Sequence, residues 1–104
     1  MPAVVTGDRT CRVFSYTGEG DDCKYPMTTY TDECSSKVFI DSFGIVREGD
    51  KVAPHNKRNC VPDESTLSTY SSKVFVEGKG VARIGDSYGD DNLITSGSGK
   101  VFAG

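Results

Sequence analysis

The chain repeats two short segments three times, and this repeat constrains its fold more than any other feature. The first segment ends in Gly-Asp and occupies residues 2–8, 44–50 and 80–86. The second has the pattern Ser-x-Lys-Val-Phe and occupies residues 35–39, 71–75 and 98–102. We call them the Gly-Asp segments and the Val-Phe segments. Such self-similarity is typical of folds in which equivalent units pack against one another.

The composition of both segments predicts β-structure. The Val-Phe segments are β-branched and aromatic and alternate polar with apolar residues, which favours short strands. Residues 41–44 and 77–80 separate strand-like stretches and are expected to form hairpin turns. In each Gly-Asp pair, the glycine is expected to supply a positive φ and the aspartate to cap local N–H groups. Because no stretch has a sustained helical period, we expect an all-β fold without a long helix.

Length and composition predict one small domain that requires additional stabilisation. With 104 residues the chain forms a single domain over residues 1–104. Its apolar content of 36% lies below the usual value of about 45–50%, so a metal, disulfides or an obligate partner should complete the fold. The net charge of −3 and the absence of a basic run argue against nucleic-acid binding. No stretch is typical of a signal peptide or a membrane span, which predicts synthesis in a cytoplasm.

The cysteines are the most reactive residues of the sequence. In a reducing compartment, cysteines favour metal ligation or free thiols over disulfides; a secreted domain held by disulfides is the alternative. Cys34 is in register with Tyr70 and Gly97, directly before the Val-Phe strands, and is expected to be a buried thiol.

The two segments resemble the signatures of the PAAR-repeat family, Pro-Ala-Ala-Arg-x-Gly-Asp followed by Ser-x-x-Val-Phe. Residues 80–86 are the most similar copy, residues 44–50 keep the arginine as Arg47, and residues 2–8 have Val5 in its place. The resemblance covers nearly the whole chain. It implies a small cone of three β-hairpin repeats with pseudo-threefold symmetry, whose loops converge on a metal site at the tip.

The same resemblance implies a structural function. Family members cap the trimeric β-helical spike of contractile phage tails or of type VI secretion and sharpen it for piercing a cell envelope. Because no further domain follows Phe102, a phage-tail tip in the virion is expected, with transient outer-membrane contact and no small-molecule substrate. Phe39, Phe75 and Phe102, or the valines beside them, are expected to fill the core or to face the spike.

The resemblance also implies a metal site in the loops that follow the Gly-Asp segments. Four residues of the first two loops form a Cys₃His set suited to tetrahedral zinc, with iron as a possible substitute: Cys11, Cys23, His55 and Cys60. The third loop, residues 87–97, contains neither histidine nor cysteine and departs from the family pattern.

Two other functions are compatible with the sequence. The first is a free-standing β module, stabilised by a metal or by disulfides, that binds a ligand. The second is a small hydrolase that uses Cys60 with His55, but neither residue lies in a recognised nucleophile motif. We therefore expect no enzymatic activity.

Overall fold

A computed structural model describes residues 1–15, 18–19, 27–57, 61–63, 65–89 and 92–104. For residues 18–19, 27, 55–57 and 61–63 the description covers the backbone alone. The described residues form antiparallel strands and no helix. The strands are β1 (Arg12–Ser15), β2 (Gly18–Glu19), β3 (Met27–Tyr30), β4 (Phe39–Ile40), β5 (Phe43–Gly44), β6 (His55–Lys57), β7 (Val61–Asp63), β8 (Phe75–Val76), β9 (Lys79–Gly80), β10 (Ser87–Tyr88) and β11 (Asn92–Ile94). The expectation of an all-β fold is confirmed.

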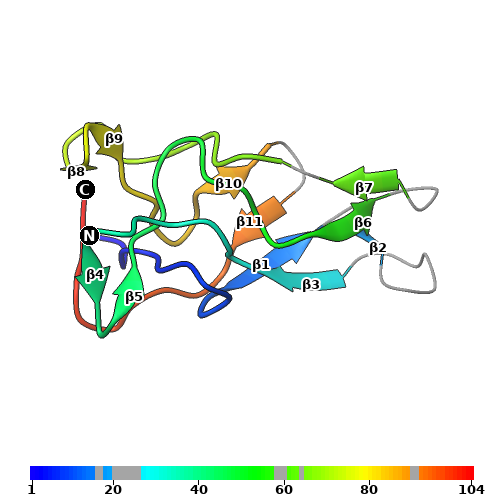
Figure 1. The fold of residues 1–104 in the computed structure, drawn as a ribbon, viewed down its shortest axis with the longest axis horizontal. Helices are drawn as coiled ribbons and strands as arrows, with labels where there is room; N and C mark the ends of the chain where they lie inside the picture. Colours follow the sequence, from blue (N-terminus) through cyan, green and yellow to red (C-terminus); the bar gives the residue numbers. More distant parts are fainter. Residues whose placement is uncertain (16–17, 20–26, 58–60, 64, 90–91) are drawn as a thin grey trace.

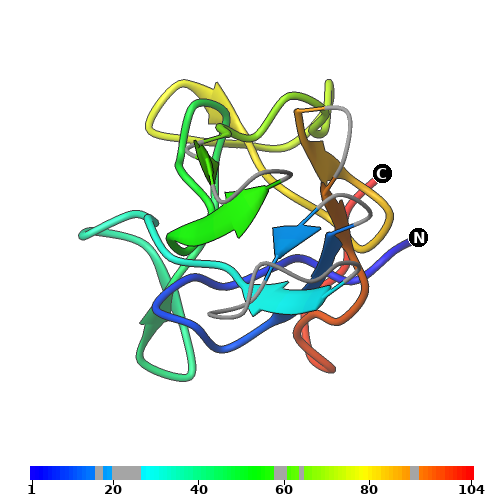
Figure 2. The same cartoon turned by 90° about the vertical axis from the view of Figure 1, so that its right-hand side faces the viewer.

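The strands form two larger sheets and two hairpins along an elongated molecule. One sheet has the order β10-β11-β1-β3 and another the order β2-β6-β7, while β4-β5 and β8-β9 pair by themselves. The molecule measures 37 × 24 × 21 Å. Both hairpins and both chain ends lie at one end of the long axis, and the β2-β6-β7 sheet lies at the other (Figure 1). Figure 2 shows the molecule from the end that carries β2-β6-β7.

The three Gly-Asp segments bond to one another in a closed ring. The N–H of Val5 donates to the carbonyl of Ala82 at 3.0 Å, that of Ala82 donates to Val46 at 2.9 Å, and that of Val46 donates to Val5 at 3.0 Å. All three residues are fully buried. Each segment therefore pairs with the next one, and the ring holds three distant parts of the chain together.

The ring shifts the register of the first copy by one residue. Counting back from Gly-Asp aligns Val5 with Arg47, but in the ring Val5 is equivalent to Val46, and Thr6 takes the arginine position. The expected positive φ is confirmed at Gly49 (85°) and Gly85 (94°) but is wrong at Gly7, since Asp8 (56°) and Arg9 (62°) adopt it instead. Gly7 is required for another reason: an added Cβ would lie 2.4 Å from the Cβ of Cys34.

Both predicted hairpins are present, with turns of two residues. Asp41 (φ 50°) and Ser42 (φ 74°) connect β4 to β5, and Glu77 (φ 54°) and Gly78 (φ 78°) connect β8 to β9. Two positive φ values in a two-residue loop are typical of the type I′ turn, whose twist matches that of paired strands.

The chain ends form a third pair at the equivalent place. Ala3 pairs with Phe102, and the N–H of Ala103 donates to the carbonyl of Pro2 at 3.0 Å. The N–H of Val4 donates to Val101 at 2.8 Å, as Ile45 donates to Val38 and Val81 to Val74 in the two hairpins. This third pair has the hydrogen bonds of a hairpin without a covalent turn.

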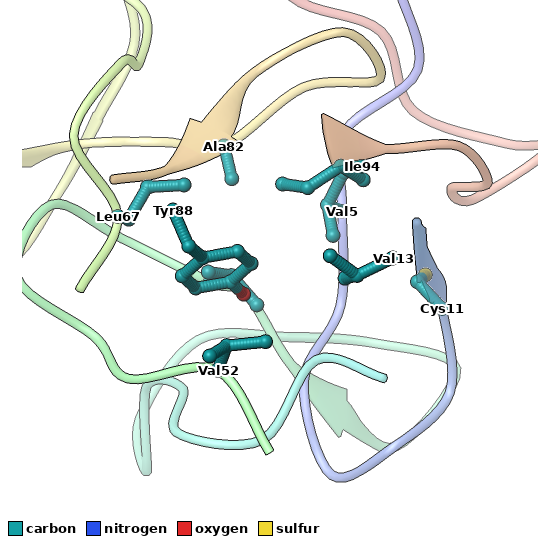
Figure 3. Packing of buried hydrophobic residues seen from close by; sticks show 9 residues of the cluster. Val5, Cys11, Val13, Val52, Leu67, Ala82, Tyr88 and Ile94 are labelled. Atoms are coloured by element: carbon teal, nitrogen blue, oxygen red, sulfur yellow. The ribbon is translucent and has the colours of Figure 1, made fainter. Parts of the chain in front are cut away.

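The core consists of two clusters. The larger one packs the three ring residues against side chains of the β10-β11-β1-β3 sheet and of the loops (Figure 3): Val5, Cys11, Val13, Val46, Val52, Leu67, Ala82, Tyr88 and Ile94. The smaller one lies among the hairpins: Val4, Ile40, Ile45, Val76, Val81 and Ala103. The Gly-Asp segments and the residues that directly follow the Val-Phe segments therefore account for the second cluster, whereas the first also depends on the loops.

Candidate functional site

Large apolar side chains are exposed on the three Val-Phe segments and the first hairpin. Phe39 is 52% exposed, Phe75 56% and Phe102 50%. We call the whole set the apolar end: Val38, Phe39, Phe43, Val74, Phe75, Val101 and Phe102. Exposed apolar residues that gather at one end of a molecule mark interaction surfaces in soluble proteins.

The serine that begins each Val-Phe segment fixes the local backbone. Ser35 Oγ accepts the N–H groups of Lys37 at 3.1 Å and Val38 at 3.0 Å. Ser71 Oγ accepts the equivalent groups of residues 73 and 74, and Ser98 Oγ that of residue 100. A short hydroxyl side chain is suited to this bond two or three residues ahead. The serine of the pattern is thus explained by the bend before each strand.

Strand alternation then directs the aromatic rings outward. Ile40, Val76 and Ala103 directly follow the three phenylalanines and are buried in the smaller cluster. Because successive residues of a strand point to opposite faces, the phenylalanines point away from that cluster. The prediction that they fill the core is wrong, and the prediction that they face the spike remains open.

In the second and third Gly-Asp segments the arginine and the aspartate form an ion pair, and both side chains are largely buried. Asp50 Oδ2 accepts the N–H of Arg47 at 2.8 Å, and Asp50 Oδ1 lies 3.1 Å from Arg47 Nη2. Asp86 accepts the N–H and the Nε of Arg83 at 2.8 and 2.9 Å. The hydrogen bond to its aspartate raises the pKa of each arginine above its usual value. The expected N–H capping is confirmed at these two positions. The arginine and the aspartate of the motif therefore have a structural role.

Arg47 also connects two repeats. Its Nη1 lies 2.9 Å from Glu77 Oε1, which in addition accepts the hydroxyl of Ser35. The hydrogen bond from Ser35 and the charges of Arg47 and Lys37 lower the pKa of Glu77 below its usual value. The turn of one hairpin is thereby attached to the Val-Phe segment of the preceding repeat.

Two of the four predicted metal ligands, Cys23 and Cys60, lie outside the described residues. His55 begins β6, and its backbone pairs with that of Asp63 in β7. This strand belongs to the sheet opposite the apolar end (Figure 1). Among the residues that the structure describes, no three of His, Cys, Asp and Glu gather into a group that could hold a metal. The four-ligand set therefore stays a prediction.

Cys11 is a free thiol in the core. It is 3% exposed and belongs to the larger cluster, near Val13 (Figure 3). Its sulfur lies 3.5 Å from the hydroxyl of Thr6 and 3.8 Å from that of Thr10. These contacts are those of a structural thiol, and its metal ligation remains a prediction.

Cys34 lies directly before a Val-Phe segment as expected, but it is half-buried where a buried thiol was expected. Its free thiol is partly buried and packs against the larger cluster. An added Cβ on Gly7 or on Gly44 would lie 2.8 Å from its sulfur, so both glycines allow close contact with this side chain. Burial, followed by the nearby carboxylates, raises the pKa of this thiol, which keeps it protonated.

The burial of Tyr88 is not predicted by the sequence. Tyr88 is fully buried in the larger cluster (Figure 3), and its hydroxyl has no hydrogen-bond partner among the described residues. Burial raises its pKa. Residues 87–92 are polar and glycine-containing, so nothing in the local sequence indicates that an aromatic ring here reaches the core.

No protein-family model and no curated protein sequence matches the chain. The resemblance to the PAAR-repeat family therefore depends on the residues of the two repeated segments. No helix of the described chain is long and apolar enough to cross a membrane.

Proposed function

We propose that this protein is the tip of the central spike of a contractile injection machine, most simply a phage-tail baseplate. The observation that carries the proposal is the apolar end, where three equivalent Val-Phe pairs are exposed on segments that each bond to one Gly-Asp segment of the hydrogen-bonded ring. The proposal includes a cone with pseudo-threefold symmetry, whose wide end is the apolar end.

A trimeric β-helix is the partner that this surface suits best. A trimer presents three equivalent edges, and three equivalent short strands can pair with them by β-augmentation. Left uncovered, such strands with exposed phenylalanine would favour aggregation. One chain with three internal repeats would therefore match three spike chains, giving one tip per trimer.

The proposed mechanism is mechanical, and the protein would be no enzyme. Contraction of the machine supplies the force, while the tip supplies shape and rigidity as it contacts the outer membrane. The ring and the ion pair of Arg47 with Glu77 support this role because they tie segments distant in sequence to one another.

A zinc ion, or iron, would hold the end opposite the spike. Thiolates and imidazole are ligands that suit zinc, and a structural zinc site crosslinks loops that cannot bury a core. His55 lies in the sheet at that end and would ligate it with Cys23 and Cys60, while Cys11, bonded in the core, fits this role least. Elemental analysis of the purified protein tests this part, and a metal-free, stably folded chain would contradict it.

The docking proposal is tested by size-exclusion chromatography with light scattering on mixtures with trimeric β-helical spikes of contractile tails. We expect one tip to elute with one trimer. The double substitution Phe39→Asp with Phe75→Asp should abolish binding, because it places two charges in the interface. Tyr30→Asp is the matched control, since Tyr30 is an aromatic residue of similar exposure in β3, away from the apolar end. A chain that binds no such spike, and stays monomeric with its apolar end uncovered, would favour the free-standing module.

A further inference from the structure

A pocket lies between the first hairpin and the last Val-Phe segment. Its volume is about 360 Å³, within the range of about 300–1,000 Å³ of sites that hold small ligands. Its wall combines one carboxylate and one ammonium group with hydroxyl and apolar groups: Thr6, Ile40, Asp41, Phe43, Ser98, Gly99 and Lys100. Phe43 also belongs to the apolar end, so the pocket is continuous with the proposed docking surface.

The equivalent place in the next repeat contains an arginine. There Arg47, which directly follows its ring residue, is equivalent to Thr6, and Glu77 is equivalent to Asp41 in the turn of the hairpin. The guanidinium of Arg47 binds Glu77 at 2.9 Å, and Ser35, the counterpart of Ser98, donates to the same carboxylate. The register shift of the first copy gives this position to a threonine. The carboxylate is therefore kept at both places, whereas the guanidinium is present at only one.

At the third place the guanidinium is kept and the carboxylate of the turn is lost. Arg83 is equivalent to Thr6 and Arg47, and it binds Asp86 of its own segment. The turn position there is Gly104, whose carbonyl accepts the hydroxyl of Ser71. No carboxylate side chain stands at this turn position. The combination of a carboxylate with a missing guanidinium is thus specific to the pocket beside Thr6.

We propose that this pocket binds a guanidinium group, supplied by an arginine side chain of the partner that covers the apolar end. The inference rests on the proposed function for the source of the arginine, though not for the chemistry of the pocket. The arginine would pair with Asp41 as Arg47 pairs with Glu77, and would hold the tip against rotation about the axis of its trimer.

The chemistry of the wall favours guanidinium over other cations. A planar guanidinium can donate to a carboxylate with two N–H groups and still pack its face on Phe43 or Ile40. The cation already present, Lys100, lies 2.9 Å from Asp41, but both side chains are more than half exposed. Because exposed ion pairs contribute little to stability, an entering arginine can displace this lysine.

The pocket is tested first with a small probe, N-acetylarginine amide, followed by ¹H–¹⁵N NMR of the full chain. We expect saturable shifts at residues 40–43 and 98–100, with a dissociation constant on the order of 1–10 mM. N-acetylcitrulline amide, which has the same shape and no charge, should cause none.

Asp41→Asn should weaken binding of the arginine probe about tenfold, and Lys100→Gln should strengthen it. Lys73→Gln, at the equivalent position beside Arg83, is the matched control and should change nothing.

Equal shifts with citrulline, or shifts that Asp41→Asn leaves unchanged, would overturn the proposal. The source of the arginine is tested on the complex with a spike, which should no longer bind the probe. A complex that still binds it with unchanged affinity would show that the partner does not fill the pocket. A chain that binds the probe but no spike would overturn the proposed function and the source, and leave the guanidinium site standing.

Discussion

At the scale of single residues, the repeated polar side chains act on the backbone. Ser35 and Ser71 accept N–H groups before the strands, and Asp50 and Asp86 accept N–H groups after the ring. Each satisfies a donor that would otherwise face a partly buried environment without a partner. The polar residues of the repeated segments are therefore explained by the fold. The proposed function uses instead the exposed apolar residues of the apolar end.

Tyr88 places a polar group in the core. Its buried hydroxyl has no partner among the described residues. Leaving such a group unbonded in the core costs about 1–3 kcal/mol, so Tyr88→Phe should raise the free energy of unfolding by about 1 kcal/mol. Urea denaturation followed by circular dichroism measures this change. Tyr70→Phe, a partly buried tyrosine packed against the same cluster, serves as control and should not stabilise the protein. A destabilised Tyr88→Phe protein would mean that the hydroxyl has a partner.

At the scale of elements, the sequence predicts what is local and misses what is distant. The hairpins at residues 39–44 and 75–80 were predicted because their turn and strand residues are adjacent in sequence. The sheet of β10-β11-β1-β3 was not, because β1 pairs with residues 92–94 across most of the chain. The predicted register of the first Gly-Asp segment is wrong for the same reason. This segment has one residue fewer than the others between its ring residue and its Gly-Asp pair, and only the hydrogen bonds of Val5 with Val46 and Ala82 show this. The metal-ligand set stays a prediction, since Cys23 and Cys60 lie outside the described residues.

The two type I′ turns provide a matched test of hairpin geometry. Ser42 has a φ of 74° where Gly78 has 78° in the other hairpin. A residue with a side chain in this region is disfavoured by about 1 kcal/mol relative to glycine, so Ser42→Gly should stabilise the protein and Gly78→Ala should destabilise it by that amount. No atom lies within 4 Å of a Cβ added to Gly78, so the change reports backbone strain alone. Thermal unfolding of the two variants should shift in opposite directions, and a shift in the same direction would contradict the turn assignment.

At the scale of the whole molecule, the two ends are built differently. The end with the hairpins comes from the repeated segments and carries the apolar residues. The opposite end comes from the unequal loops and contains β2-β6-β7 with His55 (Figure 1). This division agrees with the proposed spike tip, in which the end with the hairpins would contact a partner and the other end would not. It also explains why the repeat predicts the end with the hairpins and not the end with β2-β6-β7.

The pairing of the chain ends leads to the last prediction. Ala103 and Pro2 are equivalent to Ile40 and Phe43, so Gly104 and Met1 stand where Asp41 and Ser42 form a turn. Joining Gly104 directly to Met1 would therefore give a two-residue hairpin turn, and Met1→Gly would make it Gly-Gly, which suits type I′ geometry. The new chain ends can be placed between Asp41 and Ser42, where the side chains are exposed.

We expect this circular permutant to fold, to unfold cooperatively, and to keep its midpoint of thermal unfolding within about 5 °C, since a difference of about 1 kcal/mol shifts a domain of this size by roughly 4–8 °C. A permutant opened between Val5 and Thr6 cuts the ring itself and should not fold. If both permutants fold equally well, the ring does not organise this end of the molecule.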